Sequence, residues 1–159
     1  MENVISNKEV LIEETFNASV ERVFNAWTDP QKLMQWYAPD GCTIHFKELE
    51  IKTGGRFHSC ISNPQFGDCW CIGEYKEIIP NKKLVFTMEN ADENGNPINP
   101  ADIGMDADWP GKTMVTVTFI AEGEKTKLQL RQTVSEELAK KTGAYPSWLQ
   151  MLRKLDEVI

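Results

Sequence analysis

The segment TMVTVTFIAEGEKTKLQLRQT, residues 113–133, decides the fold class. Apolar and polar residues alternate on both sides of Glu122-Gly123-Glu124, which is a turn signal. A period of two is typical of strands with one buried face. The segment therefore predicts two strands, at about 113–122 and 125–133, joined as an antiparallel hairpin.

The same alternation continues toward the N-terminus and predicts five more strands. The connections between them are short and contain turn-forming residues at Gly54-Gly55 and at Pro80-Asn81-Lys82. Short connections favour a meander of antiparallel neighbours. The additional strands are expected at about 8–16, 43–52, 56–63, 69–79 and 83–90.

Helical periodicity appears on both sides of this strand region. After the first strand, Ser19 can cap a helix with an apolar stripe that ends at Trp27, and Asp29-Pro30 begins a second short helix. A short helix is expected at 135–141, before Gly143. The last helix is amphipathic and covers 146–159, with its apolar stripe at Trp148, Leu152, Leu155 and Ile159.

Two hairpin registers predict which strand residues face the core. A turn at Thr53-Gly54-Gly55 would pair Ile51 with Phe57 and Leu49 with Ser59, whereas a turn at Gly54-Gly55 alone would mix charged and apolar residues on one face. The first alternative is favoured because it separates them. It places His58 toward solvent, near Glu50.

At the Pro80 turn, the favoured register pairs Ile79 with Leu84, Tyr75 with Met88 and Glu77 with Phe86. Cys71 and Gly73 then face inward with Tyr75. Glu77 is left on the apolar face, so either a bulge turns it outward or it is a polar group at a cavity edge.

Composition excludes several partners. The chain has 24 acidic and 17 basic residues and a net charge of −7, which argues against nucleic acid or an anionic membrane as the main partner. There is no apolar stretch of transmembrane length and no signal-peptide pattern, so a cytoplasmic protein is expected. The four cysteines are expected to be reduced and metal-free, and no metal or other cofactor is predicted.

Most of the excess negative charge lies in one segment, the acidic loop at 89–111. Between Met88 and Lys112 there are six acidic residues and no lysine or arginine. We interpret this loop as an insertion in a single domain that covers residues 1–159, and the loop could border a pocket mouth.

An antiparallel sheet with one apolar face needs a cover, which the last helix can supply. The chain also resembles the activator-of-heat-shock-protein-90-ATPase homologue-like family, in the START-like (SRPBCC, polyketide cyclase) superfamily. The ordered motifs that carry the resemblance are FNASVERVFNAWTDP at 16–30, GGRF at 54–57, GEYKEI at 73–78, LVFT at 84–87, VTVTF at 115–119, and Trp148 with Leu152 and Leu155.

The resemblance implies an α+β helix-grip fold, like that of START and Bet v proteins. In this fold a curved seven-stranded antiparallel sheet surrounds a long C-terminal helix, two short helices follow the first strand, and a hydrophobic cavity lies inside. It implies no single chemistry. A co-chaperone role is not favoured, because the chaperone activator itself combines this domain with a separate N-terminal one.

We therefore expect a binding protein for a small hydrophobic or aromatic molecule, held between the sheet and the C-terminal helix. The alternatives are a cyclase- or hydrolase-like enzyme, for which Tyr75, Glu77, Ser59 and His45 are the interior acid or base candidates, and a chaperone-binding domain. The predicted ligand contacts come from the registers, the central strand and the helical roof. They are Phe57, Ser59, Tyr75, Phe86, Met88, Val117, Phe119, Trp148, Met151 and Leu152.

Overall fold

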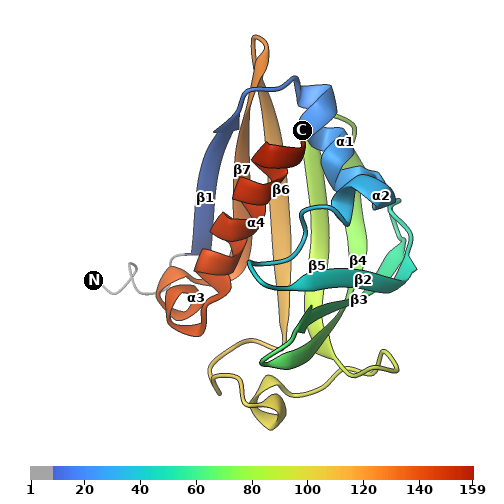
Figure 1. The fold of residues 1–159 in the computed structure, drawn as a ribbon, viewed down its shortest axis with the longest axis vertical. Coiled ribbons are helices and arrows are strands. Elements are labelled where there is room, and N and C mark those ends of the chain that lie inside the picture. Colours follow the sequence, from blue (N-terminus) through green and yellow to red (C-terminus); the bar gives the residue numbers. More distant parts are fainter. Residues whose placement is uncertain (1–8) are drawn as a thin grey trace.

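A curved seven-stranded antiparallel sheet packs against helix α4 in the computed structural model of this chain, which describes residues 9–159 (Figure 1). The strand order across the sheet is β1-β7-β6-β5-β4-β3-β2, so the predicted meander is confirmed. The predicted strand at 8–16 begins at Glu9 in the described residues, and Lys8 lies outside them. The strands are β1 (Glu9–Phe16), β2 (Thr43–Leu49), β3 (Arg56–Asn63), β4 (Gly67–Ile79), β5 (Lys83–Ala91), β6 (Lys112–Glu122) and β7 (Lys125–Ser135).

The two helices that follow β1 begin where the capping residues predict, and the last helix begins at Ala144, two residues before its predicted start at 146. The Ser19 side chain accepts a hydrogen bond from the Arg22 amide at 3.3 Å, and the Asp29 carboxylate accepts one from the Gln31 amide at 2.9 Å. Gly143, at φ +92°, ends α3 in a left-handed conformation, and α4 follows at once. The helices are α1 (Val20–Thr28), α2 (Pro30–Leu33), the 3₁₀ helix η2 (Pro100–Ile103), α3 (Glu136–Thr142) and α4 (Ala144–Val158).

The predicted register of the β2–β3 hairpin is wrong, by two residues at Phe57 and by three at Ser59. Leu49, and not Ile51, lies opposite Phe57, and Phe46 lies opposite Ser59. The glycine turn instead forms backbone hydrogen bonds with β4. The Gly54 amide donates to the Tyr75 carbonyl, and the Tyr75 amide donates to the Gly55 carbonyl, both at 2.8 Å. The turn is therefore longer than predicted. Phe57 and Ser59 are nevertheless buried, as the predicted inward face requires.

The expected exposure of His58 is also corrected. His58 lies opposite Glu48, not near Glu50, and it is only 8% exposed. Its Nε2 lies 3.0 Å from the Asp92 carbonyl, so the acidic loop covers this part of the outer sheet face. The prediction failed because a strand pattern alone does not show which loop covers the second face of a sheet.

At the Pro80 turn a bulge between Tyr75 and Glu77 changes the register. Tyr75 lies opposite Phe86 rather than Met88, and Glu77 lies opposite Val85 rather than Phe86. The bulge turns Glu77 outward, where it forms an ion pair with Lys83 at 3.1 Å. Of the two alternatives for Glu77, the outward bulge is the one found.

Gly73 allows the aromatic residues of the inner face to pack closely. It lies opposite Phe57, and a Cβ atom at Gly73 would overlap both the Phe57 ring and the Thr87 carbonyl. Glycine is therefore required by space at this strand position. The Phe57 ring lies over the Gly73 backbone and reaches Tyr75 and Phe86, with ring centroids 5.9 and 6.2 Å away.

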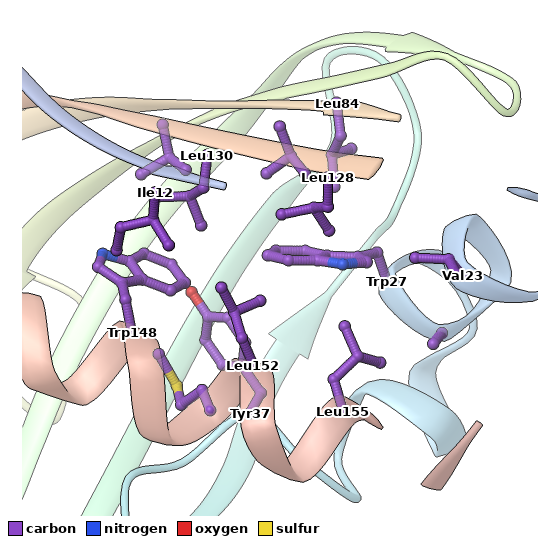
Figure 2. Close-up of a cluster of buried hydrophobic side chains, with 14 of the residues drawn as sticks. Ile12, Val23, Trp27, Tyr37, Leu84, Leu128, Leu130, Trp148, Leu152 and Leu155 are labelled. Atoms are coloured by element: carbon purple, nitrogen blue, oxygen red, sulfur yellow. The ribbon is translucent and has the colours of Figure 1, made fainter. Parts of the chain in front are cut away.

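The centre of the core is a tryptophan stack between α1 and α4. Figure 2 shows the Trp27 ring between the leucines of β7 on one side and Leu152 and Leu155 of α4 on the other. The rings of Trp27 and Trp148 stack at 6.5 Å, and Tyr37 packs edge-on against both. This arrangement leaves the space between the sheet and α4 filled by side chains.

The acidic loop lies at the end of the sheet opposite the β6–β7 turn (Figure 1). Asp92 caps its first turn by accepting hydrogen bonds from the amides of Asn94 and Asn96 at 2.9 and 2.8 Å. Asp106 forms a 3.0 Å ion pair with Lys141, which ties the loop to α3. Across residues 9–159, the helices are too short or too polar to cross a bilayer.

Candidate ligand-binding site

A small internal cavity lies among aromatic side chains of the inner sheet face, α1 and the segment around α2. Its volume is about 10 Å³, which is room for about one water molecule. Every lining side chain is aromatic or leucine. The lining residues are Trp27, Leu33, Tyr37, Phe46, Phe57, Tyr75, Leu84 and Phe86.

Of the ten predicted contact residues, three line the cavity and seven do not. Phe57, Tyr75 and Phe86 line the cavity. Ser59 is buried and donates a 3.5 Å hydrogen bond to the Cys71 carbonyl, and Met88 is half-buried. The others are buried in the packed core outside this cavity: Val117, Phe119, Trp148, Met151 and Leu152. Whether any of the ten contacts a ligand stays a prediction.

Five lining residues were not among the predicted contacts: Trp27, Leu33, Tyr37, Phe46 and Leu84. Sequence reasoning assigned Trp27 to core packing, which it also provides. Phe46 lies on the inner face because it pairs with Ser59, so the correct β2–β3 register would have found it. Tyr37 follows α2 in an irregular segment, and no periodic signal places its ring.

One fully buried polar atom of a lining residue lacks a hydrogen-bond partner among the described residues. Trp27 is 1% exposed, and within the described residues its Nε1–H is buried without a hydrogen-bond acceptor. By contrast, the Trp148 Nε1–H donates to the Gln132 side chain at 2.9 Å. An unsatisfied buried donor costs about 1–3 kcal/mol and is uncommon in folded proteins. An acceptor placed beside Trp27 would remove this cost.

The remaining polar groups of the lining are the hydroxyls of Tyr37 and Tyr75. Burial raises the pKa of each phenol well above its usual value, so both are protonated at neutral pH. They can donate or accept hydrogen bonds, but they are poor bases. The eight lining residues include no carboxylate, imidazole or cationic side chain.

The other interior acid or base candidates lie elsewhere. Glu77 is on the surface with Lys83, and the His45 ring packs against Trp70 on the outer face of the sheet. Cys71 faces inward, and burial raises the pKa of its thiol to about 12, so it is a weak nucleophile at neutral pH. Among residues 9–159, no group of three or more His, Cys, Asp or Glu side chains is arranged to hold a metal ion.

A surface cleft of about 310 Å³ lies next to the cavity. Tyr37 lines both spaces, and Ile44 of β2 lines the cleft while Phe46 of the same strand lines the cavity. Tyr37 and β2 therefore separate the cavity from the cleft. β2 is an edge strand, and β3 is its one partner among the described strands, so the barrier is formed at the margin of the sheet.

Polar contacts from α4 hold the segment that follows α2. Lys154 Nζ donates to the Ala38 carbonyl at 2.8 Å, and Arg153 forms a 2.8 Å ion pair with Asp40. The Gln150 side chain accepts from the Asp40 amide at 3.0 Å. These contacts position Tyr37 between the cleft and the cavity.

Comparison with known protein families agrees with the fold. The sequence model described as Activator of Hsp90 ATPase homolog 1-like protein matches residues 17–159. The chain belongs to this family. The observed fold is the helix-grip, START-like fold that the family resemblance implied. No curated protein of established function matches the chain.

Solved structures from bacteria share the fold at low sequence identity. A protein from Arthrobacter aurescens is 22% identical, with a TM-score of 0.80 over 98% of this chain and 87% of that one. Protein Ms6760 from Mycobacterium smegmatis is 19% identical, with a TM-score of 0.80 over 98% and 92%. An AHSA1 protein from Silicibacter pomeroyi is 18% identical, with a TM-score of 0.73 over 94% and 96%. These likenesses establish the architecture alone.

Proposed function

We propose that this protein binds a small apolar or aromatic molecule carrying one hydrogen-bond acceptor, and that the acceptor pairs with the Trp27 Nε1–H. The observation that carries the proposal is that Trp27, a lining residue of the aromatic cavity, has a buried Nε1–H with no acceptor among the described residues. An apolar lining with one or two placed polar groups is typical of small-molecule sites. The absence of a charged group among the eight lining residues disfavours a strongly ionic ligand.

The cavity must enlarge to admit such a molecule, since about 10 Å³ holds only a water molecule. The neighbouring cleft supplies the route. Rotation of the Tyr37 ring, together with an outward shift of β2, would join the cleft to the cavity. Tyr37 and β2 both lie at the sheet margin. An edge strand is held by one neighbouring strand and not by two, so fewer hydrogen bonds oppose its movement.

The same lining supports binding over catalysis. A cyclase or hydrolase mechanism needs a positioned acid or base, and the two tyrosines beside the cavity are protonated phenols with raised pKa values. Neither Glu77 nor His45 lines the cavity. A binding role requires only the apolar lining and the donor.

Two probes of nearly equal shape test the proposal. 1-Acetylnaphthalene carries a carbonyl acceptor, and 1-ethylnaphthalene does not. Isothermal titration of the wild type should give about 5- to 10-fold tighter binding of the ketone, because one hydrogen bond to a buried donor contributes about 1 kcal/mol net. The Trp27→Phe variant should bind both probes equally.

Trp148→Phe is the matched control. It also removes a buried indole from the same stack, but Trp148 does not line the cavity and its Nε1–H already has a partner. This variant should keep the preference for the ketone. Failure of the wild type to bind either probe, or an unchanged preference in Trp27→Phe, would contradict the proposal.

A further inference from the structure

A second, larger hollow lies at the end of the sheet that carries the acidic loop, away from the internal cavity. Its volume is about 640 Å³, and it lies between the β3–β4 turn and the acidic loop. Trp70 forms part of its floor. Since Tyr75 faces inward on the same strand, alternation along β4 places Trp70 on the opposite face. We name this hollow the outer groove.

The outer groove has an exposed apolar wall. Phe66, in the β3–β4 turn, is 86% exposed, and Ile103, at the end of η2, is 49% exposed. Ile98 and Met105 add further apolar surface. A solitary exposed apolar residue needs no explanation, but several around one hollow mark a contact surface.

The rim of the groove is acidic. Asp68, Asp92 and Glu93 line it, and the loop that forms one wall has no basic residue between Met88 and Lys112. One lysine reaches the groove: the Lys47 ammonium donates to the backbone carbonyl of Glu93 at 2.7 Å and lies over the Trp70 ring. Within residues 9–159, no base forms an ion pair with the carboxylate of Asp68 or Glu93.

The floor of the groove also offers an unpaired strand edge. β4 begins at Gly67, but its pairing with β5 begins only at Trp70, opposite Ala91. Residues 67–69 therefore pair with β3 on one side, and among the described residues no strand pairs with them on the other. An edge of this kind can accept an added strand from another chain.

We propose that the outer groove binds an extended segment of a partner protein in which apolar residues alternate with lysine or arginine. Its backbone would pair along residues 67–69, its apolar side chains would contact Phe66 and Ile103, and its basic side chains would face Asp68 and Glu93. A second copy of this chain fits poorly, because a two-fold contact through the groove would oppose two acidic rims. Nucleic acid is disfavoured for the same reason.

The test uses a fluorescein-labelled peptide of sequence KVKIKV, with EVEIEV as the charge-reversed probe. Fluorescence anisotropy should show saturable binding of KVKIKV, about 10-fold or more tighter than that of EVEIEV. The affinity should fall when NaCl rises from 50 to 500 mM, because exposed charges are screened. Amide shifts of residues 67–69 should accompany binding in NMR spectra.

Paired variants locate the site. Asp68→Asn with Glu93→Gln should weaken KVKIKV binding about 5- to 10-fold and reduce its salt dependence. Phe66→Ser with Ile103→Ser should weaken it by a similar factor. Both substitutions alter exposed side chains, so folding should be unaffected. The matched control is Glu122→Gln with Glu124→Gln, two exposed acids at the β6–β7 turn at the other end of the sheet.

Equal weakening by the control variant would show that net charge alone attracts the peptide and would overturn the proposal. So would binding that no groove variant alters, or a Phe66-dependent dimer in light scattering that excludes the peptide. Retained peptide binding in Trp27→Phe is expected, because the groove and the internal cavity share no lining residue.

Discussion

Two buried tryptophans stack in the core, yet their N–H groups have different surroundings. The Trp148 Nε1–H is paired with Gln132, which also donates to Thr113 at 3.1 Å. In the part of the chain that the structure describes, the Trp27 Nε1–H has no acceptor. The same substitution should therefore have different energetic consequences at the two positions, because only one of them breaks a buried hydrogen-bond network.

We expect Trp148→Phe to lower the free energy of unfolding more than Trp27→Phe, by about 1–2 kcal/mol, since the first leaves the Gln132 oxygen unpaired and the second removes an unpaired donor. Urea denaturation of both variants measures the difference. The loss of ring volume is the same in each, so it cancels to first order. A larger loss in Trp27→Phe would show that its N–H is satisfied in the folded protein.

The helices, the strands and their meander order followed from local signals, and the registers of two hairpins did not. Capping at Ser19 and Asp29 and the two-residue period of β6 and β7 involve neighbours in sequence, so these elements could be predicted. The bulge in β2 has no distinctive sequence pattern, whereas the bulge in β4 was one of two alternatives, because Glu77 fell on the apolar face. The Gly54-Gly55 turn pairs with Tyr75, a contact across the sheet that a hairpin calculation does not include.

The candidate site shows the same division. Phe57, Tyr75 and Phe86 could be assigned to the inner face, because side chains alternate between the two faces along each strand even where the residue opposite them differs from the predicted one. The residues that close the cavity come from outside the sheet. Tyr37 is held by contacts between α4 and the segment after α2, which are more than a hundred residues apart. No local pattern reports such packing.

Helix α4 covers the sheet through one face only, and this asymmetry can be measured. Leu152 is 2% exposed and packs among the core residues of Figure 2, whereas Leu149 on the same helix is 37% exposed. Leu152→Ala should lower the free energy of unfolding by about 2–5 kcal/mol, and Leu149→Ala should change it by less than about 1 kcal/mol. Denaturant titrations that give equal losses would contradict the observed orientation of α4.

At the scale of the molecule, the first turn of the acidic loop depends on the charge of one carboxylate, that of Asp92. Hydrogen bonds from the Asn96 amide and side chain and from the Asn94 amide lower the pKa of the Asp92 carboxyl. A carboxyl whose pKa is lower in the folded protein than in the unfolded chain stabilises the fold at any pH above its unfolded-state pKa. This stabilisation is lost as the pH falls through the folded-state pKa. The loop turn should therefore be intact near neutral pH.

Acidification should open this turn at a defined pH. The amide resonances of Asn94 and Asn96 should titrate together, with a midpoint below the value of about 3.9 of an unperturbed aspartate. In Asp92→Asn the carboxylate is absent, and neither amide should show this transition. A midpoint at or above the unperturbed value in the wild type would mean that Asp92 does not cap the turn.

The most direct test of the binding account follows the indole N–H of Trp27 during ligand addition. In ¹H–¹⁵N spectra, 1-acetylnaphthalene should shift the Trp27 Nε1–H resonance downfield, as a new hydrogen bond requires, and 1-ethylnaphthalene should not. The Trp148 resonance should keep the signature of its bond to Gln132 with both probes. A Trp27 resonance that stays in place while 1-acetylnaphthalene binds would contradict the account.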